Sequence, residues 1–334
     1  MARAISGKVV VVTGASSGVG RAIARAFGAE GAKVGLIARG REGLAHAAAE
    51  IARAGGEALP LALDVADAGA VERAADEVAA RYGRIDVWVN DAMVSVFSPA
   101  WEMRPEEYRR VTEVNYLGTV HGTLAALRHM RRRDEGTIIQ IGSALVYRSI
   151  PLQSAYCASK AAIRGFTDSL RSELLHDRSR VRLVMLQLPA VNTPQFDVVR
   201  TRLPRRPQPV PPIYQPEVIA RAAVHAARHP ARELWIAVSA IKAIVGQRLV
   251  PGFADRYLAR HGFDAQQTDE PEPPNRPDNV DAPLPGDRGA HGRFDRRSRR
   301  FSLELWMRMH PLAALASAAL ATAGARAGWR VLRA

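Results

Sequence analysis

The stretch Lys-Val-Val-Val-Val-Thr-Gly-Ala-Ser-Ser-Gly-Val-Gly occupies residues 8–20. Its β-branched run up to Thr13 is typical of a strand that is buried on both faces. The alanine-rich spacing of residues 21–30 then predicts a helix. Glycines between a strand and a helix let the main chain approach an anion at the helix N-terminus, where unpaired N–H groups and the positive dipole end lie. The stretch therefore predicts a turn that binds the phosphates of a dinucleotide.

The alternation of strands and helices continues along the chain. Apolar runs predict further strands at residues 33–38, 58–63, 85–89, 137–141, 181–188 and 233–238. Helical patterns lie at residues 42–54, 68–82, 105–133, 156–175, 216–227, 240–249 and 251–261. Repeated strand–helix units with nearly unbroken apolar strands predict an α/β fold with a doubly wound parallel sheet of about seven strands, the Rossmann fold. Ligands are expected at the carboxyl ends of these strands.

Charge divides the chain into regions. The net charge is +14, and arginine carries almost all of the positive side. Residues 264–287 hold seven acids against Arg276, whereas residues 291–334 hold nine arginines against Asp295 and Glu304. We expect a single Rossmann domain at residues 1–263, a Pro, Asp and Arg-rich segment at 264–300, and a basic Ala/Leu-rich helical tail at 301–334.

The two segments after residue 263 leave alternatives open. Residues 264–300 have little to bury, so they form either an ordered wrap or a flexible linker, and the composition favours the flexible linker. The apolar stripe of residues 311–323 is shorter than the roughly 20 residues of a membrane span. Packing on protein is the preferred prediction for it, with peripheral membrane contact as an alternative. The tail lacks interleaved aromatic residues, so no specific nucleic-acid partner is expected.

The expected compartment is the cytoplasm. Cys157 is the only cysteine, which excludes an intramolecular disulfide and fits a reducing environment. The first eight residues lack the apolar run of a secretory signal. Membrane association through the tail is the alternative.

Residues 154–160, Ser-Ala-Tyr-Cys-Ala-Ser-Lys, carry the strongest chemical signal. Tyr156 and Lys160 are four residues apart at the start of an expected helix, so their side chains share one face. An ammonium group beside a phenol lowers the pKa of the phenol, which makes it a proton donor and acceptor. An exposed tyrosine beside a solvated lysine is the alternative for this pair alone.

Taken together, these motifs resemble the short-chain dehydrogenase/reductase family over roughly residues 5–250. The glycine pattern of the family is matched by Thr13, Gly14, Gly18 and Gly20, and its Tyr-x-x-x-Lys by Tyr156 and Lys160. Its serine is matched by Ser143 after the fifth strand, and its helix asparagine by Asn115. The resemblance implies an oxidoreductase that transfers a hydride between a nicotinamide cofactor and a carbonyl or secondary alcohol.

The resemblance also implies a role for each catalytic residue. Tyr156 is the general acid/base, and Ser143 hydrogen-bonds the reacting oxygen. Lys160 contacts the nicotinamide ribose, and Asn115 holds a water that links Lys160 to bulk solvent. None of these roles needs a metal. Members of the family commonly pair through the helices that carry Asn115 and Tyr156, so a homodimer or homotetramer is expected.

The preferred cofactor is read at the end of the second strand. NAD usually calls for an acid here, whereas this chain has Ala38 and then Arg39, and arginine favours the 2′-phosphate of NADP. Ser16 and Arg41 are candidate helpers, and the alternative is that Arg39 stacks on adenine or faces water. The expected cofactor-binding residues are Gly14, Ser16, Ser17, Gly18, Val19, Gly20, Arg39, Asp64, Val65, Asn90, Ala92, Tyr156, Lys160, Val191 and Thr193.

Two departures from the family pattern leave a second function open. The family's Asn-Asn-Ala-Gly becomes residues 90–93, Asn-Asp-Ala-Met, so that Asp91 adds an acid and Met93 replaces a glycine close to the expected cofactor. The family's Pro-Gly after the sixth strand becomes Leu188-Pro189. A catalytically weak NADP(H)-binding sensor or scaffold is therefore the alternative to an enzyme.

The loop at residues 194–214 bears on the substrate. Its apolar residues, Phe196, Val198, Val199 and Tyr214, either line a pocket for an apolar carbonyl or cover the core of the fold. The sequence leaves both interpretations open.

Overall fold

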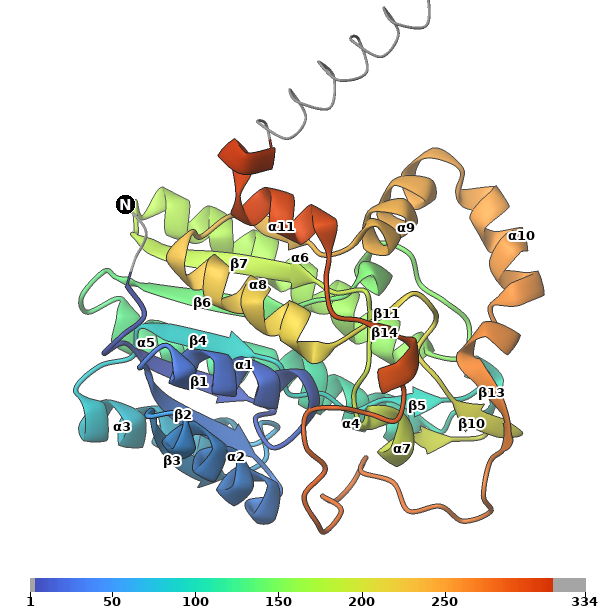
Figure 1. Ribbon diagram of the computed structural model, residues 1–334, viewed down its shortest axis with the longest axis horizontal. Coiled ribbons are helices and arrows are strands. Elements are labelled where there is room, and N and C mark those ends of the chain that lie inside the picture. Colours follow the sequence, from blue (N-terminus) through green and yellow to red (C-terminus); the bar gives the residue numbers. More distant parts are fainter. Residues whose placement is uncertain (1–3, 315–334) are drawn as a thin grey trace, which may run out of the picture.

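The computed structural model describes residues 4–314 (Figure 1). Its centre is a sheet of seven parallel strands in the order β12-β7-β6-β4-β1-β2-β3. The strands are β1 Val9–Thr13, β2 Lys33–Ala38, β3 Glu57–Ala62, β4 Val87–Asn90, β6 Gly136–Ile141, β7 Val181–Gln187 and β12 Glu233–Trp235. The chain builds outward from β1 to β3 and then returns to place β4 on the other side of β1. This switch confirms the predicted doubly wound Rossmann fold.

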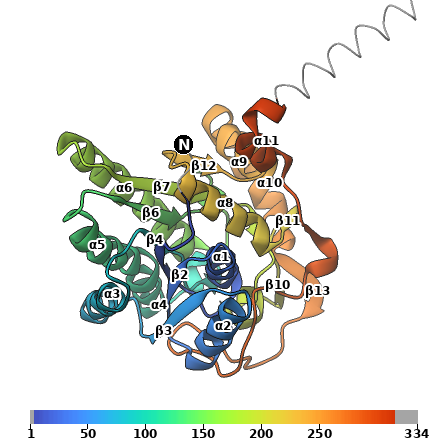
Figure 2. The same cartoon turned by 60° about the vertical axis from the view of Figure 1, so that its left-hand side comes forward.

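Helices cover both faces of the sheet (Figure 2). Helices α1 (Gly18–Ala29), α2 (Arg41–Arg53) and α8 (Pro216–Arg228) cover one face. Helices α3 (Ala68–Tyr82), α5 (Gly118–Met130) and α6 (Ser154–His176) cover the other. An apolar core lies on each face of the sheet, and β1 contributes to both. Val10 and Val12 pack into one core, and Val9 and Val11 pack into the other. Burial on both faces explains the unbroken apolar strands.

The long helix expected at residues 105–133 is interrupted. It consists of α4 (Pro105–Val111), a π-helical stretch η2 (Thr112–Leu117) and α5, which ends at Met130. Such wider turns are rare and gather at functional sites. The expected catalytic residue Asn115 lies in this stretch.

Short elements that the sequence did not indicate lie beyond the carboxyl edge of the sheet. They are β5 Val96–Phe97, η1 Ala100–Glu102, η3 Ala144–Val146, β8 Ala190–Val191, α7 Gln195–Val198, β9 Arg200–Thr201, β10 Arg205–Pro207 and β11 Ile213–Tyr214. Phe196 packs edge-on against Phe97 and Phe294 in a third apolar core. Phe196, Val198, Val199 and Tyr214 are all buried.

Residues 264–300 are packed on the domain, which corrects the prediction of a flexible linker (Figure 1). Strand β13 (Gln267–Pro271) pairs antiparallel with β10, and β14 (Ser298–Arg299) pairs parallel with β11. The short turns η4 (Asp264–Gln266) and η5 (Asp295–Arg297) lead directly into β13 and β14. The physical reason is that the acids of this segment pair with distant arginines, as Asp278 does with Arg200 at 2.8 Å.

Three further helices belong to the carboxyl-terminal third. Helices α9 (Val238–Leu249) and α10 (Pro251–His261) stand beside the carboxyl edge of the sheet (Figure 1). Helix α11 (Leu303–Met309) packs Leu305 into the core under α8. Most of the stripe expected at residues 311–323 lies outside the described residues. Within residues 4–314, no helix is long and apolar enough to cross a bilayer.

Candidate active site

The glycine turn joins β1 to α1. Gly14 and Gly18 have φ of +74° and +59°, in the left-handed region that favours glycine. A Cβ on Gly20 would lie 2.5 Å from the carbonyl oxygen of Gly14, so α1 approaches the turn more closely than a side chain allows. Ser17, at the N-cap, makes no side-chain hydrogen bond to the helix. The turn therefore fits a phosphate group at the start of α1.

The chain after β4 crosses directly beside this turn. The hydroxyl oxygen of Thr13 accepts hydrogen bonds from the N–H groups of Asp91, at 3.0 Å, and Ala92, at 3.1 Å. A Cβ on Gly14 would lie 3.0 Å from the main chain of Ala92. Glycine at residue 14 and the hydroxyl of Thr13 thus hold the ends of β1 and β4 together.

Asn90 lies beneath this crossing. Its amide donates to Gln140 at 2.9 Å and to Thr123 at 3.1 Å, and its oxygen accepts from Trp88 at 2.8 Å. The side chain is buried and does not line the cavity above. Asn90 therefore ties β4 to β6 and α5 and does not face the expected cofactor.

Ser143, Tyr156 and Lys160 meet where β6 ends and α6 begins. The hydroxyl of Ser143 lies beside the phenol of Tyr156 and accepts from the N–H of Leu145 at 3.2 Å. The ammonium group of Lys160 lies 5.6 Å from the centre of the Tyr156 ring. It donates to the carbonyl oxygen of Ile141 at 2.7 Å. The structure thus brings three of the four expected catalytic side chains together.

Burial sets the protonation of this cluster. It raises the pKa of the Tyr156 phenol above its ordinary value, and the hydrogen bond with Ser143 lowers it only in part. Burial likewise lowers the pKa of Lys160 to about 8, against the attraction of Asp91. It raises the pKa of Asp91 to about 7, against the opposing effects of Lys160 and the Gly20 N–H. The pKa of Tyr156 is therefore raised by desolvation, whereas the sequence led us to expect that Lys160 would lower it.

The side chain of Asn115 forms hydrogen bonds beside the catalytic cluster. Its side-chain oxygen accepts from the N–H of Val94 at 2.8 Å, and its amide donates to the carbonyl of Val94 and to the hydroxyl of Ser159, both at 3.0 Å. These bonds join η2, the segment after β4 and α6. Asn115 is fully buried and does not line the cavity.

A cavity of about 920 Å³ lies at the carboxyl edge of the sheet. It contains most of the residues expected from the sequence, namely Gly14, Ser16, Ser17, Gly18, Val19, Arg39, Asp64, Val65, Ala92, Ser143, Tyr156, Lys160, Val191 and Thr193. Gly20, Asn90 and Asn115 do not line the cavity, but they belong to the segments that form it. Asp91 and Met93 also line it. The glycine turn and the catalytic cluster thus open into one space.

The sequence profile of the short chain dehydrogenase family matches residues 8–203 of this chain. This protein belongs to the short-chain dehydrogenase/reductase family. It is 34% identical over 269 residues to the uncharacterized oxidoreductase YxnA of Bacillus subtilis, which covers 80% of this chain and 76% of that protein. A fatty acyl-CoA reductase of Acinetobacter baylyi is 35% identical over 194 residues, 58% of this chain and 65% of that protein.

Solved structures of the short-chain dehydrogenase/reductase family share the fold. A metagenomic short-chain oxidoreductase in complex with NADP superposes with a TM-score of 0.59 at 32% identity, covering 70% of this chain and 98% of that one. An alcohol dehydrogenase of Thermococcus sibiricus complexed with 5-hydroxy-NADP gives 0.60 at 30% identity, covering 69% and 95%. The family and these neighbours support an oxidoreductase that uses a nicotinamide dinucleotide.

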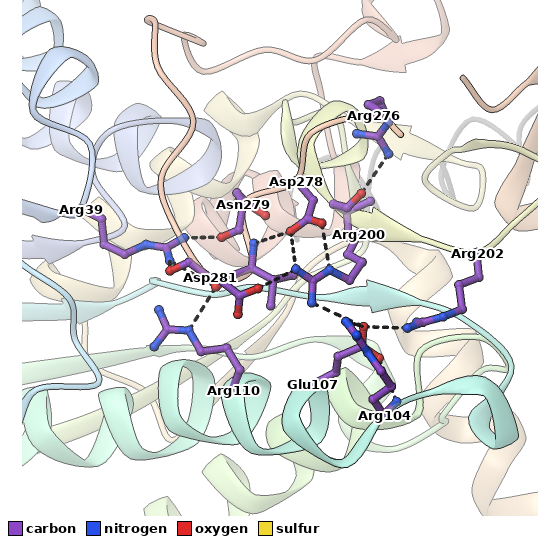
Figure 3. Close-up of polar contacts among 12 residues, drawn as sticks. Arg39, Arg104, Glu107, Arg110, Arg200, Arg202, Arg276, Asp278, Asn279 and Asp281 are labelled. Carbon is purple, nitrogen blue, oxygen red and sulfur yellow. Dashed lines mark hydrogen bonds and ion pairs between the residues drawn. The ribbon is translucent and has the colours of Figure 1, made fainter. Parts of the chain in front are cut away.

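Arg39 has partners that the family pattern does not anticipate. Its guanidinium donates to the main-chain carbonyls of Asn279, Val280 and Asp281, in the carboxyl-terminal segment (Figure 3). Arg110 donates to the Val280 carbonyl at 3.0 Å and also pairs with the carboxylate of Asp64. The end of β2, where NAD and NADP are distinguished, is therefore in direct contact with the carboxyl-terminal segment.

Sequence reasoning missed two groups of residues that line the cavity. One comes from the carboxyl-terminal segment and comprises Asn279, Pro283, Leu284, Gly286 and Arg288. The other comes from α9 and α10, and includes Ala243, Val250, Phe253, Tyr257 and Leu258. For the first group, the signal available in the sequence was the net negative charge of residues 264–287 in a strongly basic chain. Apolar faces on α9 and α10 gave no comparable signal.

Proposed function

We propose that this protein is an NADP(H)-dependent oxidoreductase that reduces a carbonyl, or oxidises the corresponding secondary alcohol. The observation that carries the proposal is that Ser143, Tyr156 and Lys160 open into the same cavity as the glycine turn. A dinucleotide bound at the turn therefore has the phenol of Tyr156 in the same cavity. The reaction needs no second cavity, because the cofactor turn and the catalytic residues share this one.

The protein residues handle the proton and the developing charge. The bound nicotinamide supplies or accepts the hydride. In the reductive direction, Tyr156 donates its phenolic proton to the carbonyl oxygen as that oxygen gains charge. The hydroxyl of Ser143, which faces the phenol of Tyr156 before substrate binds, turns its single proton toward the same oxygen. Lys160 places a buried positive charge beside the ring and stabilises the phenolate that remains.

Asn115 would support this cluster as a positioning residue. It fixes Val94 and Ser159 by hydrogen bonds, and Ser159 lies on the α6 turn that carries Tyr156 and Lys160. The water link from Asn115 to Lys160 remains a prediction. Val191 and Thr193, which line the same cavity, would hold the nicotinamide amide.

NADP is the proposed form of the cofactor. Arg39 follows β2 directly and lines the cavity together with Ser16 and Gly43. A guanidinium beside the adenosine ribose attracts a 2′-phosphate, whereas a carboxylate at this position would repel it. The NADP-bound structural neighbours support the same choice. Three of the guanidinium hydrogen bonds already go to main-chain carbonyls, so Arg39 would meet the phosphate with its remaining N–H groups.

The proposed substrate is a carbonyl compound with an apolar body. Beyond the catalytic cluster the cavity lining includes the polar residues Arg148, Lys242 and His261, but much of it is apolar, namely Leu145, Ile150, Val210, Phe253, Tyr257 and Leu258. Phe253 and Tyr257 stack on α10, with ring centres 6.3 Å apart. Such a wall favours apolar surface over charge. A relative named as a fatty acyl-CoA reductase fits this class.

Assembly into a homodimer or homotetramer is part of the proposal. Leu124, on the helix that continues from Asn115, is 52% exposed, and Leu175, near the end of the Tyr156 helix, is 65% exposed. Apolar side chains on these two helices are suited to contact with a second copy.

A second candidate is a binding protein that senses NADP(H) without turnover. The observation that favours it is that Asp91 and Met93 both line the cavity beside the glycine turn. The intact cluster of Ser143, Tyr156 and Lys160 favours the enzyme.

The test is the variant Tyr156→Phe, which removes only the phenolic oxygen. Turnover is measured with NADPH and a set of probes: a long-chain methyl ketone, a cyclic ketone and an aromatic aldehyde. We expect kcat/KM to fall about 10²- to 10⁴-fold while NADPH binding changes by less than about threefold. The control is Tyr82→Phe, at the end of α3 and away from the cavity. Unchanged turnover in Tyr156→Phe would remove that residue from the mechanism.

A further inference from the structure

The segment at residues 278–289, here called the strap, runs along the outer side of the cavity at the end that holds Arg39 and Asp64. Five of its residues, Asn279, Pro283, Leu284, Gly286 and Arg288, line that cavity. We propose that the strap is the outer wall of the cofactor site, and that its undocking limits the exchange of NADP(H). This inference rests on the proposed use of NADP(H).

The first anchor of the strap is the end of β2. Arg39 donates to three successive carbonyls, those of Asn279, Val280 and Asp281 (Figure 3). The side chain of Val280 is fully buried and packs in the core that contains α3 and α5. The N–H of Asn279 donates to the carbonyl of Val198 at 2.9 Å. The strap is therefore bound to both sides of the cavity mouth, at Arg39 and at Val198.

The second anchor is a cluster of charges around Arg200. This guanidinium binds Asp278 at 2.8 and 3.1 Å and Asp281 at 2.6 Å (Figure 3). It also lies 3.4 Å from the buried carboxylate of Glu107, which pairs with Arg202 at 2.8 Å. The acids of the strap raise the pKa of Arg200, so the guanidinium stays charged. The Arg200–Asp278 pair is partly buried and fixes the strap more strongly than the exposed pair with Asp281 does.

The third anchor is the amino end of α1 and α2. Asp287 pairs with Arg21, whose side chain is only 2% exposed, and with His46 at 2.8 Å. These contacts lower the pKa of Asp287 to about 2, against the effect of burial. Gly289 accepts a hydrogen bond of 3.0 Å from the N–H of Gly18, in the glycine turn. The strap thus contacts the phosphate-binding turn itself.

The chain beyond the strap packs against residues 192–193, which follow β8. The side chain of Asn192 accepts from the N–H of Phe294 at 3.1 Å and donates to Asp295 at 2.9 Å. A Cβ on Gly292 would lie 2.4 Å from the carbonyl oxygen of Thr193, so the two main chains are in close contact. The carboxyl-terminal segment therefore runs from Arg39, past the glycine turn, to the main chain of Thr193, which itself lines the cavity.

In this proposal, a cofactor beneath the wall leaves only when the strap is displaced. The anchors join segments about 80 to 270 residues apart in the chain, as Arg200 with Asp278 and Arg21 with Asp287 show. Their loss should weaken strap docking without opening the central sheet, because Arg21 keeps Glu50 at 3.0 Å and Arg200 keeps Glu107. Local opening of this kind is a low-energy motion compared with global unfolding.

The experiment measures NADPH association and dissociation by stopped-flow fluorescence in the full chain. The variants are Asp287→Asn and the double variant Asp278→Asn with Asp281→Asn. The matched control is Asp264→Asn, which removes an acid of the same segment whose pair with Arg205 is exposed and lies outside the strap. We expect both rate constants to rise about tenfold or more in the strap variants and to stay at the wild-type values in the control.

Two kinetic results would overturn the inference. Unchanged rates in both strap variants mean that the strap does not limit exchange. A rise in association alone means that the strap competes with the cofactor and does not cover it. Wild-type protein that binds no NADPH would overturn the proposed function, whereas tight binding with unchanged rates overturns the strap inference alone.

Hydrogen exchange on the wild-type protein provides a test that does not depend on the folding of any variant. With saturating NADPH, the amides of residues 278–289 should exchange about tenfold more slowly or slower still than without it. Equal exchange with and without NADPH would contradict a cofactor-covering strap.

Discussion

Lys160 donates a hydrogen bond of 2.7 Å from its ammonium group to the carbonyl oxygen of Ile141. This bond links α6, which carries Tyr156, to the end of β6, which leads into Ser143. The lysine is 3% exposed, and burial lowers its pKa to about 8. A single side chain therefore joins the two elements of the catalytic cluster and supplies its positive charge.

Removing this charge should disable catalysis more than binding. We expect Lys160→Met to lower kcat/KM about 10²- to 10⁴-fold, because the phenolate of Tyr156 loses its cation. The ammonium loses its proton as the pH rises through about 8, so wild-type kcat/KM should fall above that pH. The variant should lack this alkaline limb. Lys33→Met, on the exposed side of β2, is the control, and a variant that keeps the wild-type pH profile would contradict the role of Lys160.

Gly20 offers a test of the phosphate-binding turn. In Gly20→Ala the new Cβ would lie 2.5 Å from the Gly14 carbonyl oxygen and 2.7 Å from the Asp91 carboxylate. Forcing these groups apart should lower the free energy of unfolding by about 1–3 kcal/mol and weaken NADPH binding. In the control Gly165→Ala, on α6, the Cβ meets nothing within 4 Å. That helix change should stabilise the protein by about 0.5–1 kcal/mol. Equal effects of the two changes on NADPH affinity would contradict the close approach.

Asp91 should make folding stability fall as the pH rises. Its pKa is about 7 in the folded protein and about 4 in an unfolded chain. Between these values the folded state keeps a proton that the unfolded state has released, so the free energy of unfolding decreases with increasing pH and levels off above 7. We expect Asp91→Asn to remove this slope. The variant should then be more stable than wild type at pH 8 by roughly 1–3 kcal/mol.

Urea unfolding at pH 5 and pH 8 measures this difference. Asp76→Asn is the control with the opposite sign, because the hydrogen bond from Arg128 lowers the pKa of Asp76 and its contribution is lost as the pH falls. A pH slope in Asp91→Asn equal to that of wild type would show that Asp91 does not hold a proton in the folded protein. The same variant should move the alkaline limb of activity to lower pH, since Asp91 raises the pKa of Lys160.

The fold could be predicted because its strands are apolar on both sides. The run of valines in β1 is compatible only with a buried strand, and the structure has that strand. In contrast, β12 was predicted to extend to residue 238, but it ends at Trp235. Ala237 has a φ of +73°, which a strand does not allow, and α9 begins at Val238. Local composition gave no sign of that change of direction.

The catalytic cluster could be predicted because its residues follow strand ends and helix starts in a fixed order. The wall of the cavity could not, because its contacts are distant in sequence. Arg39 and Val280 are 241 residues apart, and neither residue type alone indicates the other. The low hydrophobicity of residues 264–300 favoured the prediction of a flexible linker. Their acids instead pair with arginines of the domain, as Asp278 does with Arg200.

The most direct measurement is a parallel titration of the wild-type protein with NADPH and with NADH, followed by cofactor fluorescence, and repeated with Arg39→Ala. The account predicts that NADPH binds at least about tenfold more tightly than NADH, and that Arg39→Ala removes most of this difference by weakening NADPH alone. Equal binding of the two cofactors would contradict the assignment of Arg39. Binding of neither would contradict the proposed NADP(H)-dependent oxidoreductase.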